Sequence, residues 1–437
     1  MHHKTTTWMA MGLLAMSSIA HAQNPAIDQL SQFANSATTL NNARAIGTLC
    51  FAGNRLSARL QSDCNTLVGA AFGADPALDT AVRSALARIT ADNATIPLDR
   101  SGLGKASLVP VAPSGSGPGW AALMTADPSV VAMSLSGDGD GADWSLFVNA
   151  RFDQNDRDRS ANEDGFSSDG NAATVGVDLR TSPNSHVGAA VSFGRSNLDY
   201  TGASGKLDTR ETGFNLFAGW QADNGFYLDS LLTFNRRKQD QVRRIAYGLG
   251  SSSVDQSFDS KFDSDERLLA LTAGFQVNRG AASFNPYLRV ELVKADSDGY
   301  TEISRNPTGN GGGWALQVAP IDESFNRTAL GMRAAYAISG SNGVYLPFVD
   351  LSLIKVNGAN NEPASVRYTG DLSANVNLSA VDFLMVADAE DNSYGSAALG
   401  MSAQWANGWS GFFSYRRNFA ESRYTQEQIN LGLRMEF

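Results

Sequence analysis

The sequence has no apolar run long enough to cross a bilayer as a helix, which takes about 20 residues. It also lacks an excess of positive charge: the 437 residues carry 34 Lys and Arg against 44 Asp and Glu, a formal net charge of -10. Without a basic patch, nucleic acid is excluded as an expected partner. The mean hydropathy of -0.21 hides any membrane character, as happens when polar lumen residues of a β-barrel dilute the apolar ones.

Histidine and cysteine are also scarce, which narrows the possible chemistry. Three of the four histidines precede the signal cleavage site expected below, so the mature chain keeps only His186. A Ser-His-Asp site would have to be built around that residue, and no G-x-S-x-G elbow occurs. Zinc lacks ligands once the two cysteines pair. We therefore expect no enzyme, no cofactor and no metal site.

The first 22 residues have the features of a secretory signal peptide. Lys4 supplies a sparse basic region, residues 8–19 supply a short apolar core, and Ala20-His21-Ala22 supplies a small-x-small cleavage pattern. Cleavage is expected before Gln23. In an exported chain, Cys50 and Cys64 are expected to form a disulfide, which would contribute about 3 kcal/mol to stability.

Residues 23–100 are predicted to form a small helical segment, a short passenger or plug. Three apolar stripes with i, i+3/i+4 spacing indicate three helices. Their members are Ile27, Leu30, Ala34, Ala37 and Leu40, then Leu56, Leu60, Cys64, Leu67 and Ala71, then Leu78, Val82, Leu86 and Ile89. Two of these helices begin with an N-cap residue followed by proline, at Asn24-Pro25 and Asp75-Pro76.

Two placements of this segment stay open. Residues 75–93 would form a helix about 26 Å long, long enough to thread a barrel lumen. Alternatively, the helices pack as a disulfide-clipped bundle outside the pore, and residues 120–133 occupy the lumen. Residues 101–142 are predicted to be a Gly/Pro/Ser-rich linker and pore-proximal segment.

Residues 143–437 predict an all-β membrane barrel with twelve antiparallel strands. The last strand alternates strictly, with Ile429, Leu431, Leu433, Met435 and Phe437 on one side and Asn430, Gly432, Arg434 and Glu436 on the other. A period of two is the strand signature, and a membrane barrel requires an apolar lipid face opposite a polar lumen face. Leu431→Arg or Leu433→Arg is expected to be disruptive, and Gly432→Ser, on the lumen side, to matter far less.

Connections of two lengths alternate along this segment. The short ones carry turn residues and lie at 182–185, 223–225, 279–283, 340–343 and 406–408. The long ones lie at 152–171, 244–263, 297–323 and 357–392. Short periplasmic turns that alternate with long extracellular loops are typical of bacterial barrels, so both ends of the barrel segment are expected in the periplasm.

The strand phase assigns roles to the remaining polar and aromatic residues. Aromatic residues at the periplasmic strand ends are expected to form an interfacial girdle: Trp144, Trp220, Phe226, Tyr287, Tyr345, Trp405 and Trp409. Charged residues of the opposite phase are expected to line the lumen: Arg180, Asp229, Arg289, Glu291, Arg333, Asp350, Arg416, Arg434 and Glu436. Charges of both signs can line a pore, grip a plug, or only stabilise the barrel.

A signal peptide, an N-terminal segment, a linker and a C-terminal barrel that ends in Phe437 resemble an autotransporter, the type V secretion class. The final strand resembles the C-terminal assembly signal of outer-membrane barrels, carried here by Phe437, Met435, Leu433, Leu431 and Ile429. The resemblance implies an outer-membrane translocator, inserted by the barrel-assembly machinery with periplasmic chaperones. The family's usual passenger is a long β-helix, and the segment before this barrel is much shorter.

The expected function is therefore an outer-membrane translocator barrel that carries, or is plugged by, its own N-terminal segment. Two alternatives stay open: a surface adhesion or structural protein that acts through its long loops, and a passive diffusion pore. The expected partners are outer-membrane lipid, the assembly machinery and a possible extracellular surface ligand. The chain is expected to be a monomer with its loops at the cell surface.

Overall fold

The computed structural model of the protein describes residues 25–51, 55–73, 76–91, 144–160, 163–358, 363–376, 380–386, 391–405 and 408–436. The expected signal peptide, the expected linker at 101–142 and Phe437 lie outside these residues.

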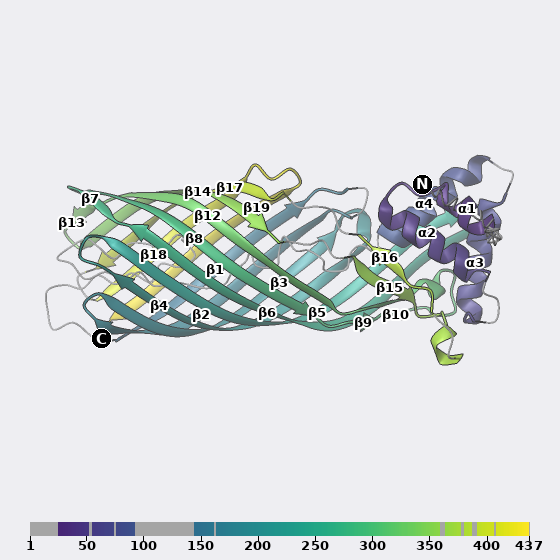
Figure 1. Cartoon of the computed structure of the whole chain (residues 1–437), viewed down its shortest axis with the longest axis horizontal. Coiled ribbons are helices and arrows are strands. Elements are labelled where there is room, and N and C mark those ends of the chain that lie inside the picture. The colour runs from purple at the N-terminus through teal and green to yellow at the C-terminus, as the bar shows by residue number, and fades with distance from the viewer. Residues whose placement is uncertain are drawn as a thin grey trace, which may run out of the picture.

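Twelve long strands of the described chain form a closed antiparallel barrel, as predicted (Figure 1). They are β1 (Trp144–Arg157), β2 (Phe166–Ser182), β3 (Ser185–Tyr200), β4 (Gly205–Gln221), β5 (Phe226–Leu249), β6 (Ser252–Phe275), β8 (Ala282–Ser297), β12 (Ile321–Tyr336), β14 (Gly343–Asn357), β17 (Ser393–Trp405), β18 (Trp409–Phe419) and β19 (Tyr424–Glu436). Each pairs with the next, and β19 pairs with β1, from Ser145 opposite Glu436 to Arg157 opposite Tyr424. Closure leaves no free sheet edge, which a lipid environment requires.

The exposure of side chains alternates along the barrel strands. On β19, Leu431 and Leu433 are 42% and 53% exposed, whereas Asn430 and Arg434 are 1% and 6% exposed. The apolar side chains therefore cover the outside of the barrel and the polar ones fill its inside, the arrangement that a bilayer selects. Short β7 (Val277–Arg279) and β13 (Ile338–Gly340) pair with β8 and β14 at the short turns. We call this end of the barrel the turn end, and the opposite end the loop end.

The barrel is much taller on one side. β5 and β6 each contain 24 residues, whereas β18 contains 11. The expected loop at 244–263 is wrong, because most of it continues these two strands as a hairpin. Beyond the lipid both faces of the hairpin can be polar: Lys238 and Lys261 are exposed, and inward-facing Gln239 and Gln241 are buried. The inward face mixes such polar residues with apolar ones such as Ile245 and Phe258, so a sequence pattern finds no regular apolar period there.

Two other long loops fold into a small sheet at the loop end. The loop after β8 holds β9 (Tyr300–Thr301), β10 (Ile303–Ser304), η3 (Gly312–Trp314) and β11 (Leu316–Val318). The loop after β14 holds β15 (Ala364–Tyr368), η4 (Ser373–Val376) and β16 (Phe383–Met385). A further short helix, η2 (Thr201–Ala203), joins β3 to β4. The strands β16-β15-β11-β9, in that order, form what we call the loop sheet.

The described N-terminal residues form four helices, where three are predicted. They are α1 (Pro25–Ser31), α2 (Ala37–Leu49), α3 (Ala58–Ala71) and α4 (Pro76–Ala91). The first predicted helix is split because Ser36 starts a new one: its hydroxyl accepts from the Thr39 N–H at 3.1 Å, and the Thr39 hydroxyl accepts from the Ser36 N–H at 2.8 Å. Such reciprocal capping satisfies backbone donors at a helix start. Because α1 and α2 are separate helices, the i, i+3/i+4 spacing of the predicted stripe does not continue from one to the other, and Ala37 of that stripe is exposed.

The other two predicted stripes agree with the buried faces of α3 and α4. On α3, Leu60, Cys64 and Leu67 have no exposed surface, and on α4 the same holds for Val82, Leu86 and Ile89. The predicted disulfide is present between Cys50 and Cys64, with Cα atoms 5.2 Å apart. It joins the end of α2 to the middle of α3. The four helices α1–α4 pack their apolar faces together, and this disulfide joins two of them. We call this compact bundle the helical cap.

The helical cap lies at the loop end, far from the short turns and from the end of β19 (Figure 1). It shares one apolar core with the outer part of β5 and β6 and with the loop sheet, through Leu60, Ile245, Phe258, Trp314 and Tyr368. Residues 76–91 pack on β5, α2 and α3, so this helix does not thread the barrel. Residues 120–133, the alternative occupant of the lumen, lie outside the described residues. None of the described helices has the length and hydropathy needed to cross a membrane.

Candidate functional site

The inside of the barrel holds charged residues of both signs in close pairs. Near the turn end, Arg434 donates to Asp178 at 2.8 Å and lies 3.7 Å from Glu436. Arg333 donates to one carboxylate oxygen of Asp350 at 3.0 Å, and both side chains are almost fully buried. Because the partners come from different strands, each pair fastens one part of the wall to another.

A second set of pairs lies on β8 and β12. Arg289 donates to Glu291 at 2.7 Å, and Arg327 lies 2.5 Å from the other oxygen of that carboxylate. These are neighbours in the wall, because Arg327 and Glu291 are directly paired in the register of β12 and β8. A carboxylate between two guanidinium groups makes a strong charge-assisted contact with each, so this part of the wall is cross-linked by charge.

A third cluster was not predicted from the sequence. Arg237 of β5 donates to Glu211 of β4 at 2.6 Å and to Glu266 of β6 at 3.2 Å. The alternation along β5 could have identified Arg237 as a lumen residue. It is eight residues beyond the predicted lumen residue Asp229, and an even spacing keeps both side chains on the same face of the strand. Arg327 was not predicted either, although it lies six residues before Arg333 on β12 and so has the same inward phase. Charge pairs inside the barrel thus reach further toward the loop end than predicted.

The remaining predicted lumen residues share the inward phase. Asp229 is 2% exposed. Arg180 and Arg416 are half-buried, as expected for long side chains near an opening. The arrangement as a whole is a polar interior of paired charges, and whether it serves a pore or only braces the wall stays a prediction.

The predicted aromatic girdle is partly corrected by the structure. Trp144, Trp220 and Trp409 are 49%, 45% and 39% exposed at the turn end. Phe226, Tyr345 and Trp405, on the same outward phase, are half-buried. Tyr287 is different: it is 4% exposed and its hydroxyl donates to Asp350 at 3.0 Å. It shares the phase of Arg289 and Glu291, so its ring points inward, and its place in the girdle is wrong.

The terminal strand residues proposed as an assembly signal lie on the outward face. Ile429 is 39% exposed, beside the still more exposed Leu431 and Leu433, and Met435 is half-buried at the turn end. Phe437 lies outside the described residues. The role of these residues in assembly stays a prediction.

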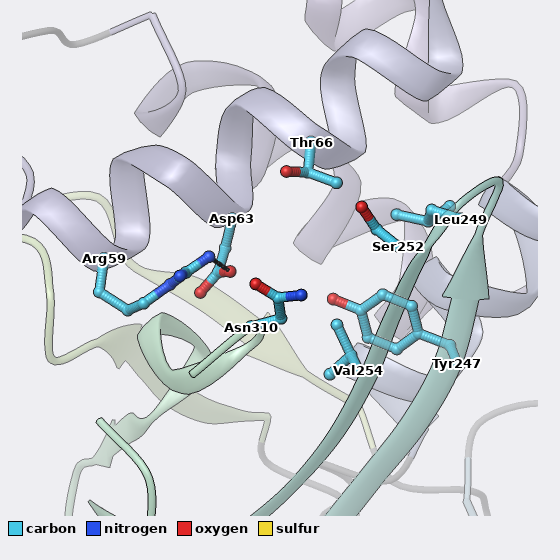
Figure 2. A pocket seen from close by; sticks show the side chains of 8 residues that line it. All are labelled: Arg59, Asp63, Thr66, Tyr247, Leu249, Ser252, Val254 and Asn310. Carbon is cyan, nitrogen blue, oxygen red and sulfur yellow. Dashed lines mark hydrogen bonds and ion pairs between the residues drawn. The ribbon is translucent and has the colours of Figure 1, made fainter. Parts of the chain in front are cut away.

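The second site is the seam between the helical cap and the loop end. The Asp63 carboxylate of α3 accepts hydrogen bonds from the Gly311 and Gly313 N–H groups at 2.8 and 2.9 Å. Arg59, one helical turn before Asp63, forms an ion pair with the same carboxylate. Figure 2 shows this seam, with Asp63 and Arg59 facing Asn310 from the helix. Gly311 has φ of +83°, and a Cβ on Gly313 would lie 2.5 Å from the Leu60 Cα. Only glycines allow the loop to approach α3 this closely.

Two more contacts fasten the helical cap to the loop sheet. The Tyr368 hydroxyl of β15 donates to the Asn42 side chain of α2 at 2.6 Å. The Thr38 hydroxyl donates to the Val386 carbonyl at 3.1 Å and accepts from the Val386 N–H at 3.0 Å. Burial raises the pKa of Tyr368 above its usual value, so this hydroxyl stays a donor. The seam is therefore bonded at several separate points.

The chain just before α3 also adds backbone hydrogen bonds to the loop end. The Ser57 N–H donates to the Gly370 carbonyl at 2.8 Å, and the Leu372 N–H donates to the Arg55 carbonyl at 2.6 Å. Leu56 and Asp371 form an antiparallel bridge between them. Such bonds are independent of side-chain identity, so they hold the register of the two segments.

A pocket opens along this seam, lined by residues of α3, β5, β6 and the loop before η3 (Figure 2). Its volume is about 10 Å³, which is room for about one water molecule. The Trp314 indole N–H donates to the Tyr247 hydroxyl at its edge, at 2.7 Å. The pocket is too small for an organic ligand, so the seam is a packing surface.

A family model described as the autotransporter β-domain matches residues 146–416, more than half of the chain. The chain belongs to the autotransporter β-domain family. Its barrel is thus a translocator barrel of the bacterial outer membrane. The lipid-facing outside and closed wall described above are the physical requirements for that location.

Three solved autotransporter structures are similar to this chain. The translocator domain of NalP from Neisseria meningitidis has 17% identity and a TM-score of 0.49, over 69% of this chain and 90% of that one. The β-domain of BrkA from Bordetella has 14% identity and a TM-score of 0.47, over 67% and 99%. The transport unit of AIDA-I from Escherichia coli has 11% identity and a TM-score of 0.39, over 70% and 93%. A search of curated proteins gave no match.

Residues 143–437 contain one histidine, His186. His186 is 5% exposed and lies in the wall, against the Phe217 ring. Within the described ranges, no three His, Cys, Asp or Glu residues are grouped so that they could hold a metal ion. The absence of an enzyme activity stays a prediction.

Proposed function

We propose that this autotransporter barrel displays its own N-terminal helical cap at the cell surface and keeps it there, docked on the loop end. The observation that carries the proposal is the docking itself. Asp63, Asn42 and Thr38 of the cap each bond to a segment of the loop end. A cap built to be released would not share an apolar core with the loops beneath it.

The path of the chain supports export of the cap. Ala91 ends the cap at the loop end, and Trp144 begins β1 at the turn end. These two residues therefore lie at opposite ends of the barrel. In an autotransporter, the turn end with both barrel termini faces the periplasm, so the cap belongs on the outer side.

The proposed role is display and closure, without catalysis. The charge pairs described above, such as Arg434 with Asp178, join strands of the wall, which suits a brace more than a reaction centre. The short cap covers the loop end in place of a long passenger. Insertion by the barrel-assembly machinery and periplasmic chaperones is part of the same proposal.

Cysteine labelling in intact cells tests the proposal. Arg44 is exposed on α2, and Asn342 is exposed in a short turn at the turn end. With a maleimide that cannot cross membranes, Arg44→Cys is expected to react in intact cells, and Asn342→Cys only after the outer membrane is opened. Labelling under non-reducing conditions keeps the Cys50–Cys64 bridge. Reaction of Asn342→Cys but not Arg44→Cys in intact cells would reverse the proposed orientation.

A second candidate function is binding of another macromolecule by the cap. Phe51 and Phe72 are 56% and 49% exposed at the ends of α2 and α3, outside the lipid-facing wall. Exposed aromatic side chains away from lipid often mark an interaction surface. If the cap acts as an adhesin, cells that carry Phe51→Ser with Phe72→Ser should lose adhesion while the barrel level stays unchanged. Equal adhesion by wild-type and variant cells would leave display and closure as the function.

A further inference from the structure

A belt of basic side chains lies on the outside of the neighbouring strands β3, β4, β5, β6 and β8. Its members are Arg195, Arg210, Arg236, Lys238, Arg267 and Lys294, all of them exposed. On each strand, the outward-facing residues toward the loop end change from apolar to polar. The belt residues are the first or the second outward-facing residues after this change. We call them the basic belt.

The edge of the apolar wall fixes the height of the basic belt. The outward apolar residues that come last before the belt on these strands are Phe193, Phe214, Phe234, Leu269 and Leu292, and they are 57%, 45%, 43%, 36% and 51% exposed. Arg195, Arg236 and Lys294 each stand two residues further along the same outward face. The belt therefore lies where the hydrocarbon of the outer leaflet ends and its head groups begin.

Like charges stand side by side within the basic belt. Arg195 is directly opposite Arg210, and Arg210 is directly opposite Lys238, across three strands. Arg267 is directly opposite Lys294 on the next pair of strands. Directly opposed like charges destabilise a strand pair. An anion between them converts this repulsion into attraction, so the arrangement favours an anionic ligand.

Acidic residues lie both beside the basic belt and beyond it: Asp265 is directly opposite Arg236, and Asp263 is directly opposite Lys238, on β6 and β5. Along β6, Arg267 is followed outward by Asp265 and then Asp263, and along β8, Lys294 is followed by Asp296. Ion pairs join Arg236 to Asp263 at 2.8 Å and Lys294 to Asp296 at 3.2 Å, yet these two basic side chains remain 62% and 55% exposed. Arg210 is 69% exposed, and its contact with Asp240 is long, at 3.9 Å.

This order gives the outer surface a polarity. Along each of these strands the basic residue is the first charged residue after the apolar wall, and the acidic residues follow it toward the loop end. A mixed surface that served only solubility would have no reason to place the basic residue first on each of these strands. Guanidinium groups also match the geometry of phosphate, through two parallel hydrogen bonds.

We propose that the basic belt binds the phosphate groups of phosphorylated lipid head groups in the outer leaflet. The apolar wall below holds the acyl chains, and Arg195, Arg210 and Lys238 hold the phosphates above them. The site fixes the height of the tall β5–β6 side in the membrane. It is separate from the docking of the helical cap, because its residues face away from the barrel axis.

Binding of lipid A to the full-length folded protein in a neutral detergent tests the proposal. Diphosphoryl lipid A, monophosphoryl lipid A and phosphatidylcholine are titrated, and the dissociation constants are measured by native mass spectrometry. Affinity is expected to follow the net negative charge of the head group, which is highest for diphosphoryl lipid A and zero for phosphatidylcholine, and to fall as salt is raised. Arg195→Gln/Arg210→Gln/Lys238→Gln is expected to weaken binding of the diphosphoryl form at least about tenfold.

The matched control removes the same charge further from the membrane, as Arg244→Gln/Lys261→Gln/Arg305→Gln, whose side chains are exposed by 40%, 83% and 55%. It is expected to change the affinity less than about twofold. Heat-modifiable gel mobility verifies that each variant is folded, and Arg267→Gln/Lys294→Gln replaces the belt variant if that one is not. The proposal is overturned if belt and control variants bind alike, if phosphatidylcholine binds as tightly, or if inorganic phosphate alone binds as tightly as lipid A.

Discussion

Arg243 of β5 grips the Glu302 carboxylate with two hydrogen bonds, of 2.6 Å from Nε and 2.5 Å from Nη2. The two side chains are 1% and 2% exposed. Nη2 of Arg243 also donates to the Trp314 carbonyl at 2.8 Å, and the Leu316 N–H donates to Glu302 at 2.8 Å. One buried pair thus ties the β5–β6 hairpin to the loop sheet on which the helical cap rests.

Glu302→Gln is expected to loosen the loop end by about 3–5 kcal/mol, because it leaves the buried Arg243 charge uncompensated. Hydrogen exchange at residues 314–316 should speed up, and limited proteolysis should cut the loop between β8 and β12. Asp259→Asn is the control, since the Arg305–Asp259 pair is solvent-exposed and worth about 0–1 kcal/mol. Equal protection of residues 314–316 in both variants would mean that the buried pair is not what holds the loop.

Asp63→Asn is expected to weaken the docking of the helical cap by about 1.5–3 kcal/mol, the range for hydrogen bonds to a charged group. The Gly311 and Gly313 N–H groups would lose their carboxylate acceptor. Gly313→Ala should act in the same direction, since its Cβ would meet the Leu60 backbone. The rate at which an added protease releases the cap from intact cells measures the effect of each variant. Gly69→Ala is the control, because a Cβ there meets no atom within 4 Å.

Much of this fold follows from one pattern, the alternation of apolar and polar residues. Lipid enforces that alternation on each strand, and so the twelve barrel strands could be located from the sequence. The same rule assigns Arg333 and Asp350 to the inside, although no pattern says that they pair. The position of Tyr287 at a strand end favours the aromatic girdle, but its phase, which it shares with Arg289, places the ring inside the barrel.

The loop end was predicted less well, for a physical reason. Outside the lipid the outward face of β5 and β6 meets water, and their inward face mixes polar residues such as Gln241 with apolar ones such as Phe258, which pack in the core shared with the helical cap. These strands therefore run on without a regular apolar period. The seam depends on contacts between residues far apart in the chain, such as Asp63 with Gly311. Such contacts depend on the three-dimensional arrangement, which a single sequence does not display.

Cys50→Ser with Cys64→Ser is expected to destabilise the helical cap by about 3 kcal/mol, the loop-entropy estimate for a short closed loop. The bridge spans 14 residues and joins α2 to the buried face of α3. Proteolysis of the cap should become faster, while the barrel keeps its heat-modifiable mobility. Loss of the folded barrel as well would show that cap and barrel fold as one cooperative unit.

Deletion of Phe437, or Phe437→Ser, is expected to cut the outer-membrane level of the protein severalfold. The strict alternation from Ile429 to Met435 presents an apolar face that Phe437 continues, and aromatic residues anchor strand ends at the interface. Heat-modifiable mobility of membrane fractions measures the folded protein. Phe437→Tyr, which keeps the ring, is the control, and an unchanged level after deletion would count against an assembly role.

Leu431→Arg is expected to destabilise the barrel by about 2–4 kcal/mol near the bilayer midplane, because Leu431 faces lipid and is 42% exposed. Leu431→Met keeps an apolar surface and should be nearly neutral. The sequence alone suggests that Gly432→Ser is mild, but the structure predicts otherwise. A Cβ on Gly432 would overlap the Phe412 ring and lie 2.5 Å from the Asn149 side-chain oxygen, an overpacking that costs about 1–3 kcal/mol. Urea unfolding in lipid vesicles compares the three variants. If Gly432→Ser unfolds like the wild type, then β19 does not pack this closely against β18 and β1.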